Sequence, residues 1–122
     1  MSFVGELDEF SFFSEVEKNK GIVMVFFTGP HCASCHHLKN LLNSEHKQFT
    51  QHFLKSNIDF SVYEIKADKA AALVNQFEVF HLPSMYLYKE GKFHCELHSE
   101  AIPNKLIDAI DLALTKDPEE EP

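Results

Sequence analysis

The sequence predicts a single α/β domain in which helices cover both faces of a central mixed β-sheet. Three observations indicate this class. Residues 22–27 form an entirely apolar run rich in β-branched side chains, which is typical of a central strand buried on both faces. Residues 60–65 alternate apolar and polar side chains as a second strand does. Residues 85–98 have the pattern of two strands joined by a tight turn, and stretches with helical spacing separate these strands.

The first half of the chain is expected to hold a short strand at residues 3–7 and a helix at residues 9–18. Asp8 offers the N-cap of this helix. The apolar residues that recur in it at helical spacing are Phe10, Phe13 and Val16. After the apolar run, residues 35–56 are helical in character, and a break at residues 43–45 divides this stretch into two helices.

The second half is expected to continue with one strand, one helix and a closing antiparallel hairpin. These elements are predicted at residues 60–65, 68–77, 85–88 and 93–98. Gly91 lies in the hairpin turn, where a residue with positive φ is needed. Pro103 suits the first turn of a last helix. The charged, proline-containing residues 117–122 are expected to be a disordered tail that follows a domain of residues 1–116.

Length, charge and the first residues limit the classes of function. The 122 residues are enough for one compact domain. The net charge is −8 and basic residues form no stripe, so binding to nucleic acid or to an anionic membrane is not expected. Residues 1–9 lack the basic and apolar regions of a signal peptide, which leads us to expect a cytoplasmic protein. We also expect a monomer without a cofactor.

The most informative motif is the C-x-x-C of Cys32 and Cys35, which stands directly between the apolar strand and the helix that follows it. At the start of a helix, unpaired backbone N–H groups and the helix dipole favour a thiolate. Two cysteines about one helical turn apart can form a disulfide without backbone movement. In a reducing compartment this spacing indicates catalysis or metal binding. The third cysteine, Cys95, is expected to be a half-buried free thiol on the last strand.

Together these residues resemble the thioredoxin family. The resemblance rests on four features: the strand at residues 22–27, the C-x-x-C that opens a helix, the Leu82-Pro83 pair that starts a later strand, and the hairpin at residues 86–92. It spans nearly the whole chain and implies the thioredoxin fold. It also implies a thiol:disulfide oxidoreductase acting on disulfides of proteins or of small molecules such as glutathione, with a separate reductase that recycles the dithiol.

The resemblance implies a role for each residue of the site. Cys32 would be the exposed nucleophile that forms a mixed disulfide with the substrate, and Cys35 the buried thiol that resolves it. The bond between Leu82 and Pro83 would be cis, with the Leu82 main chain available to pair with an extended substrate. His31, next to Cys32, would contribute to substrate binding and, when protonated, stabilise the thiolate.

The chain departs from the family pattern at several positions. The common reductases have Trp before the first cysteine and Gly-Pro between the two cysteines, where this chain has His31 and Ala33-Ser34. The redox potential is therefore expected anywhere between about −270 and −120 mV. Phe26 occupies the position of the family's buried acid, and Glu64 that of its lysine partner. Glu64 could replace the acid as a proton relay, but an exposed strand residue is the more common case, and we favour that interpretation.

Three other interpretations stay open. The missing tryptophan and buried acid favour an adaptor that binds partners at Leu82 and Pro83 and does not need its dithiol. A metal site is the second, because residues 31–37 contain two cysteines and three histidines, although a proline beside the dithiol would occupy the room that further ligands need. Residues 32–36 also match the pattern for haem c attachment, which requires an export signal that the sequence does not show. We favour the redox dithiol, with no bound metal.

Overall fold

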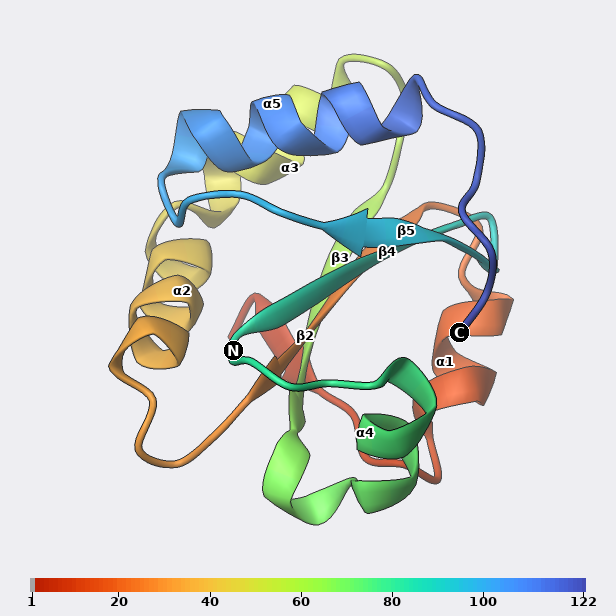
Figure 1. Ribbon diagram of the computed structural model, residues 1–122. Coiled ribbons are helices and arrows are strands. Elements are labelled where there is room, and N and C mark those ends of the chain that lie inside the picture. The colour runs from red at the N-terminus through yellow and green to blue at the C-terminus, as the bar shows by residue number, and fades with distance from the viewer. Residues whose placement is uncertain (1) are drawn as a thin grey trace.

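Five strands form one mixed sheet in the computed structural model, which describes residues 2–122 (Figure 1). The strands follow the order β1-β3-β2-β4-β5 across the sheet. Their bounds are β1 Val4–Glu6, β2 Ile22–Thr28, β3 Phe60–Lys66, β4 Ser84–Lys89 and β5 Lys92–Leu97. β2 pairs with β3 in parallel and with β4 in antiparallel, so it lies at the centre of the sheet. The predicted α/β class with a mixed sheet is confirmed.

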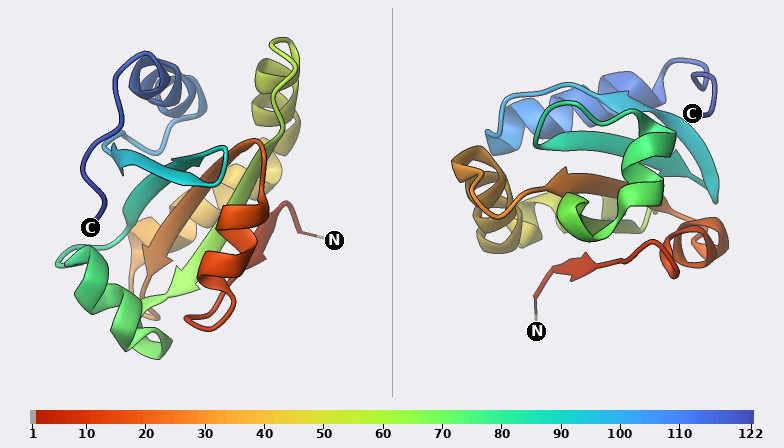
Figure 2. Two further views of the ribbon diagram at one scale, coloured as in Figure 1. Left: turned by 90° about the vertical axis from the view of Figure 1, so that its right-hand side faces the viewer. Right: turned by 60° about the horizontal axis from the view of Figure 1, so that its bottom comes forward.

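Helices cover both faces of this sheet (Figure 2). One face carries α2 (Ala33–Ser44), α3 (His46–Leu54) and α5 (Pro103–Leu114). The other face carries α1 (Phe12–Lys18) and α4 (Ala71–Phe77), and the short 3-10 turn η1 (Ala67–Lys69) leads into α4. Within residues 2–122, no helix has the length and apolar character needed to cross a membrane.

The central strand β2 contributes to both halves of the core. All of its residues are buried. Met24 and Phe26 pack in the cluster under α2, α3 and α5, while Val25 and Phe27 pack in the cluster under α1 and α4. Successive side chains of a strand point to opposite faces, so a strand between two helical layers needs apolar residues at every position. The prediction of a central strand buried on both faces is confirmed.

The first helix begins later than the sequence predicts. Asp8 does not cap a helix that starts at residue 9. Its Oδ1 accepts hydrogen bonds from the backbone N–H groups of Phe10 and Ser11, at 2.9 and 2.8 Å, in a turn that precedes α1. The helix starts at Phe12, and its buried face therefore differs from the predicted one. Phe12 and Val16 are buried, whereas Phe10 is exposed.

Three other sequence signals agree with the structure. The helical stretch after the dithiol is divided at Glu45, between α2 and α3. Glu90 and Gly91 both have positive φ in the turn between β4 and β5, which matches the twist of a hairpin. Pro103 is the first residue of α5. Residues 117–122 have no helix or strand, but they run back beside β5 in the views of Figures 1 and 2.

Candidate active site

The dithiol lies at the point where β2 ends and α2 begins. The chain passes from Thr28 through a short loop to Cys32, which occupies the N-cap position of α2. Cys32 and Cys35 form a disulfide, with their Cα atoms 5.2 Å apart. Cys35 is only 2% exposed, whereas Cys32 is partly exposed. One sulfur of the pair is therefore accessible to a partner and the other is protected.

Two donors point at the sulfur of Cys32. The backbone N–H of Cys35 donates to it over 3.2 Å, as expected at a helix N-cap. The Ser34 hydroxyl lies 3.3 Å from it and acts as the donor, because a disulfide sulfur carries no hydrogen. In the reduced protein the same two groups can stabilise a thiolate. In the sequence Ser34 stands out only as a departure from the family pattern, but a hydroxyl two residues after an N-cap can reach the cap.

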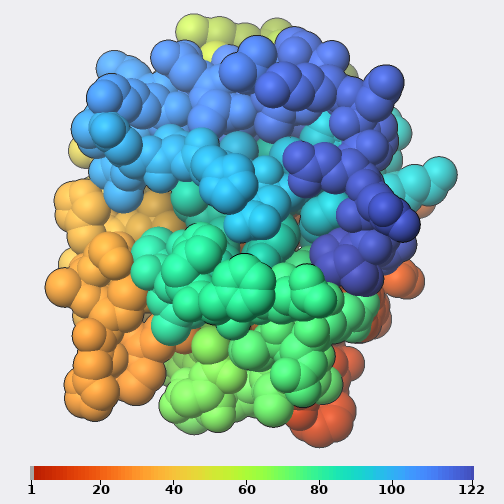
Figure 3. All heavy atoms as spheres, viewed as in Figure 1, coloured from red at the N-terminus to blue at the C-terminus, as the bar shows by residue number. Residues whose placement is uncertain are grey.

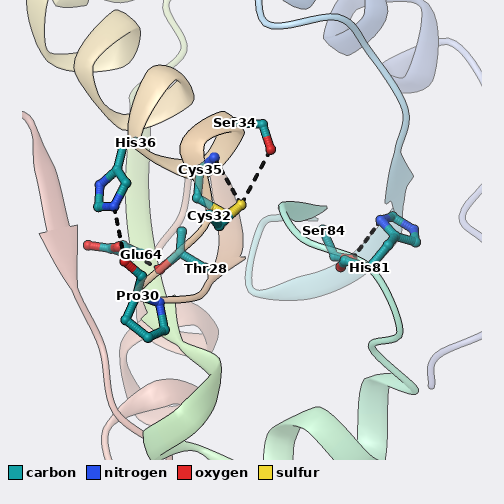
Figure 4. The surroundings of a disulfide bond; sticks show 9 residues. All are labelled: Thr28, Pro30, Cys32, Ser34, Cys35, His36, Glu64, His81 and Ser84. Atoms are coloured by element: carbon teal, nitrogen blue, oxygen red, sulfur yellow. Dashed lines mark hydrogen bonds between the residues drawn. A yellow bond between two sulfur atoms is a disulfide. The ribbon is translucent and has the colours of Figure 1, made fainter.

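The loop before β4 packs against the loop before the dithiol. The Leu82-Pro83 peptide bond is cis, as the resemblance implied. A Cβ atom added at Gly29 would lie 2.9 Å from Cδ1 of Leu82, which shows how closely the two loops approach. The hydroxyl of Ser84 donates to the carbonyl oxygen of His81 over 2.6 Å and fixes the turn that contains the proline (Figure 4). Leu82 and Pro83 are partly exposed, so both remain accessible.

The histidines near the dithiol have different surroundings. His31 is exposed, and its ring makes no hydrogen bond to any residue from 2 to 122. His36 Nε2 lies 3.4 Å from the carbonyl oxygen of Pro30, and His37 Nε2 lies 3.1 Å from that of Ala101. These two contacts connect the start of α2 to neighbouring loops. Across residues 2–122 no group of three or more His, Cys, Asp or Glu side chains is arranged to hold a metal ion.

Glu64 is buried, with 6% of its surface exposed, so the favoured interpretation as an exposed strand residue is wrong. Its side chain follows Phe60 and Val62 along β3, and both of these belong to the core under α2, α3 and α5. The alternation of residues 60–65 predicts the strand, but it does not reveal that a helix covers this end of β3.

The carboxylate of Glu64 is held by two partners from two other elements. Lys39 Nζ of α2 lies 2.9 Å from Oε1, and the hydroxyl of Thr28, at the end of β2, donates to Oε2 over 2.6 Å. Burial raises the pKa of this carboxyl group, but the bonds from Lys39 and Thr28 outweigh burial, and the pKa is lowered from its usual 4.5. Glu64 is therefore ionised at neutral pH.

This charged group lies next to the dithiol. Lys39 comes four residues after Cys35 in α2, so the two share one face of the helix. Thr28 comes four residues before Cys32. Figure 4 shows Glu64 and Thr28 beside the turn that carries the cysteines, on the side away from His81. The buried charge therefore contacts, through Lys39, the helix that also carries the protected sulfur.

The third cysteine differs from the other two. Cys95 of β5 is buried rather than half-buried, and it is a free thiol. Burial, together with the nearby Glu119 carboxylate, raises its pKa to about 11. Little thiolate forms at neutral pH, so this thiol is a poor nucleophile.

An accessible sulfur at a helix N-terminus, a protected sulfur one turn later and a cis-proline loop packed beside them define a dithiol protein of the thioredoxin type. The family model for Thioredoxin matches residues 3–112, and the chain belongs to the thioredoxin family. The predicted fold and family are therefore confirmed.

Similarity to individual proteins is more distant. The chain is 29% identical over 107 residues to Thioredoxin Y, chloroplastic, of Oryza sativa subsp. japonica, a match that covers 86% of this chain and 59% of that protein. Human ERp44, in a crystal structure called form I, superposes with a TM-score of 0.74 at 16% identity, over 92% of this chain and 29% of that one. A zinc-bound form of human ERp44 gives a TM-score of 0.71 at 12% identity, with 92% and 30% covered. At these identities the structural matches support the fold alone.

Removing the hydroxyl of Ser34 is expected to make reduced Cys32 less reactive. The Ser34→Ala variant loses one donor to the thiolate, so its alkylation by iodoacetamide at pH 7 should be about threefold to tenfold slower than in the unchanged protein. Ser44→Ala is the matched control, because Ser44 ends the same helix and its hydroxyl donates only to the Leu41 carbonyl. Equal rates in the two variants would show that the Ser34 contact does not stabilise the thiolate.

The ionised Glu64 carboxylate is expected to stabilise the fold in a pH-dependent way. A carboxyl group whose pKa is lowered by folding stabilises the protein above its usual pKa, and this contribution disappears as the pH falls through the folded value. Glu64→Gln should therefore reduce the free energy of unfolding in urea by about 1–2 kcal/mol at pH 7 and by much less at pH 3.

The control for this measurement is Glu6→Gln. Glu6 is exposed and its carboxylate lies 3.2 Å from Nζ of Lys66, which is partly exposed, so the loss should stay below about 1 kcal/mol. A Glu64→Gln effect that is the same at pH 7 and pH 3 would contradict the assignment of a stabilising charge.

Proposed function

We propose that this chain is a thiol:disulfide oxidoreductase that acts on disulfides of proteins through Cys32 and Cys35. The observation that carries the proposal is the asymmetry of the pair. Cys32 is partly exposed and accepts two hydrogen bonds at the start of α2, while Cys35 is buried behind it. Membership of the thioredoxin family supports this activity. The chain spans 59% of the length of the rice relative, so substrates and partners are inferred from the site itself.

The reaction proceeds in two exchanges. The Cys32 thiolate attacks one sulfur of the substrate disulfide, and the other sulfur leaves as a thiolate that takes up a proton. Cys35 then loses its proton and attacks Sγ of Cys32, which forms the internal disulfide and releases the second substrate sulfur. The substrate gains two electrons and the dithiol loses two. The oxidising direction is the reverse of these steps, and a separate reductase returns electrons to the dithiol in the reducing direction.

The loop before β4 supplies the binding surface in this proposal. Leu82 and Pro83 are partly exposed beside the dithiol, and the Leu82 main chain can pair with an extended substrate segment. Phe80, two residues earlier, is 87% exposed and adds an apolar side chain to the same loop. His31 directly precedes Cys32, is exposed, and supplies a polar side chain to this surface.

Glu64 is proposed as the group that accepts the proton of Cys35 during the second exchange. The carboxylate is ionised, buried and close to the α2 face that carries the protected sulfur. Lys39 and Thr28 orient it. A base in a buried position is useful here because bulk water has little access to Cys35.

Trapping experiments test the exchange of disulfides. Cys35→Ser is expected to accumulate mixed disulfides with substrate proteins, because the attacking thiol of the second step is missing. Cys32→Ser should trap none, and Cys95→Ala should behave as the unchanged protein. In glutathione buffers, alkylation and mass measurement should show a two-electron transition of the pair, near about −270 mV for a reductase and nearer −150 mV for an oxidant or isomerase.

The opposite results would favour another function. A chain that shows no transition in accessible buffers, or that loses no activity on Cys32→Ser, does not use the dithiol for turnover. Unchanged partner binding by the Cys32→Ser, Cys35→Ser double variant would then indicate an adaptor.

The pH profile of the second exchange tests Glu64. In a preformed mixed disulfide, Glu64→Gln should slow release of the substrate by about 10²-fold at pH 6, with the deficit shrinking as the pH rises and Cys35 ionises without help. Lys39→Met removes one of the two groups that orient the Glu64 carboxylate, so it should slow substrate release less than Glu64→Gln does. A slowing that is equal at every pH would show that Glu64 acts only on structure.

A further inference from the structure

The hydroxyl group of Tyr88 on β4 has no hydrogen-bond partner. Only 2% of this residue is exposed, and no atom of residues 2–122 forms a hydrogen bond with its Oη. A buried polar group without a partner costs free energy, because folding has removed it from water. Tyr86, which packs in the same core cluster, differs because its hydroxyl donates to the carbonyl oxygen of Phe77. The Tyr88 hydroxyl is therefore available to a group from outside the chain.

Tyr88 lines a surface hollow of about 410 Å³ beside the hairpin that joins β4 and β5. Glu17, in the last turn of α1, and Glu119 and Glu121 of the C-terminal segment line the same hollow. Burial raises the pKa of Tyr88, and the carboxylates of Glu121 and Glu17 raise it further, so both carboxylates lie near the hydroxyl. The unpartnered hydroxyl thus faces a hollow that acidic side chains surround.

Two sets of contacts hold the walls of this hollow in place. A Cβ atom added at Gly91, in the hairpin turn, would collide with the backbone carbonyl of Glu17, so the hairpin packs directly on the end of α1. The backbone N–H of Glu119 donates to the carbonyl oxygen of His94 over 2.7 Å, and Oε1 of Glu119 accepts a hydrogen bond from the backbone N–H of Glu96 over 3.0 Å. Figure 3 shows the C-terminal segment on the surface beside the hairpin.

The charges around the hollow favour a cation. Three carboxylates line it together with one cation, Lys92, which is exposed and forms no ion pair with any residue from 2 to 122. The same part of the chain has no group of three or more His, Cys, Asp or Glu side chains arranged to hold a metal ion, so the spacing suits a larger, organic cation.

The hydroxyl and the neighbouring ring narrow the choice of cation. The lone pairs of the Tyr88 hydroxyl accept hydrogen bonds, and a primary ammonium group carries three N–H donors. The buried ring of Phe93 lies beside the ring of Tyr88, with the ring centroids 5.6 Å apart, and also lines the hollow. It offers an apolar contact to the carbon chain that carries the ammonium group.

We propose that this hollow binds a primary ammonium group, from the side chain of a protein lysine or from a free polyamine. The ammonium group donates to Oη of Tyr88, and Glu17 and Glu121 balance its charge. Both glutamates are exposed, so their side chains can adjust around the bound cation. The hairpin adjoins the start of β2, whereas the dithiol follows the end of β2, and the proposal does not depend on the redox activity.

Titration with n-butylammonium chloride at pH 7 and constant ionic strength tests the proposal. Tetramethylammonium chloride is the comparison, because this cation has no N–H to donate. In two-dimensional NMR spectra, the backbone amide signals of Gly91 and Phe93 are expected to shift to saturation with butylammonium and not with tetramethylammonium. Tyr88→Phe removes only the hydroxyl and should weaken butylammonium binding about tenfold. Glu121→Gln should weaken it about threefold.

Each variant has a matched control. Tyr86→Phe removes a hydroxyl that already has a partner within the chain, and Glu120→Gln removes a charge that does not line the hollow. Neither control should change the binding, and circular dichroism checks that every variant is folded. A lysine tripeptide with blocked ends and 1,5-diaminopentane should shift the same signals, and the tighter of the two identifies the source of the ammonium group.

Three results would overturn the proposal. Equal butylammonium affinities of Tyr88→Phe and the unchanged protein would show that the hydroxyl does not contact the cation. Shifts that do not saturate, or that are the same with tetramethylammonium, would show only a general attraction of cations to an acidic surface. No shift with any amine would show that water alone satisfies the hydroxyl.

Discussion

The burial of β2 on both faces is the constraint on which the rest of the structure depends. Every side chain of this strand lies between two helical layers, and the strand pairs with β3 on one side and β4 on the other. Its carboxyl end delivers Cys32 to the start of α2, and its neighbour β4 begins with the cis-proline loop. The two halves of the site therefore meet because they emerge from adjacent strands at one end of the sheet.

The same constraint explains where the buried charge is found. In this chain Phe26 keeps β2 apolar, and its register partner on β3 is Glu64. Compared with the family pattern, the acid thus lies on the neighbouring strand, at the register position directly opposite. Its counter-ion comes from α2 through Lys39 rather than from a neighbouring strand. Glu64 and its counter-ion Lys39 are thus linked to the helix that carries Cys35. The chain keeps a buried carboxylate although it has Phe26 at the position of the family's acid.

Features set by local chemistry could be predicted from the sequence. The apolar run, the C-x-x-C, the hairpin turn and Pro103 each express a short-range preference, and the family resemblance supplied the cis bond before Pro83. The errors concern tertiary packing and one local turn. The burial of Glu64 depends on where α2 crosses the sheet, and the exposure of Phe10 depends on the turn held by Asp8. The contact of Glu119 with β5 joins segments far apart in the sequence, so no local pattern indicates it.

The apolar character of β2 also has a consequence for the unfolded chain. Six consecutive uncharged apolar residues, 22–27, include no proline and have high β-propensity, a combination that promotes intermolecular β-pairing whenever it is exposed. Lys18 and Lys20 on one side and Pro30 on the other interrupt this segment and limit its length. The strand that organises the native sheet is therefore also a segment that promotes aggregation when the chain unfolds at high protein concentration.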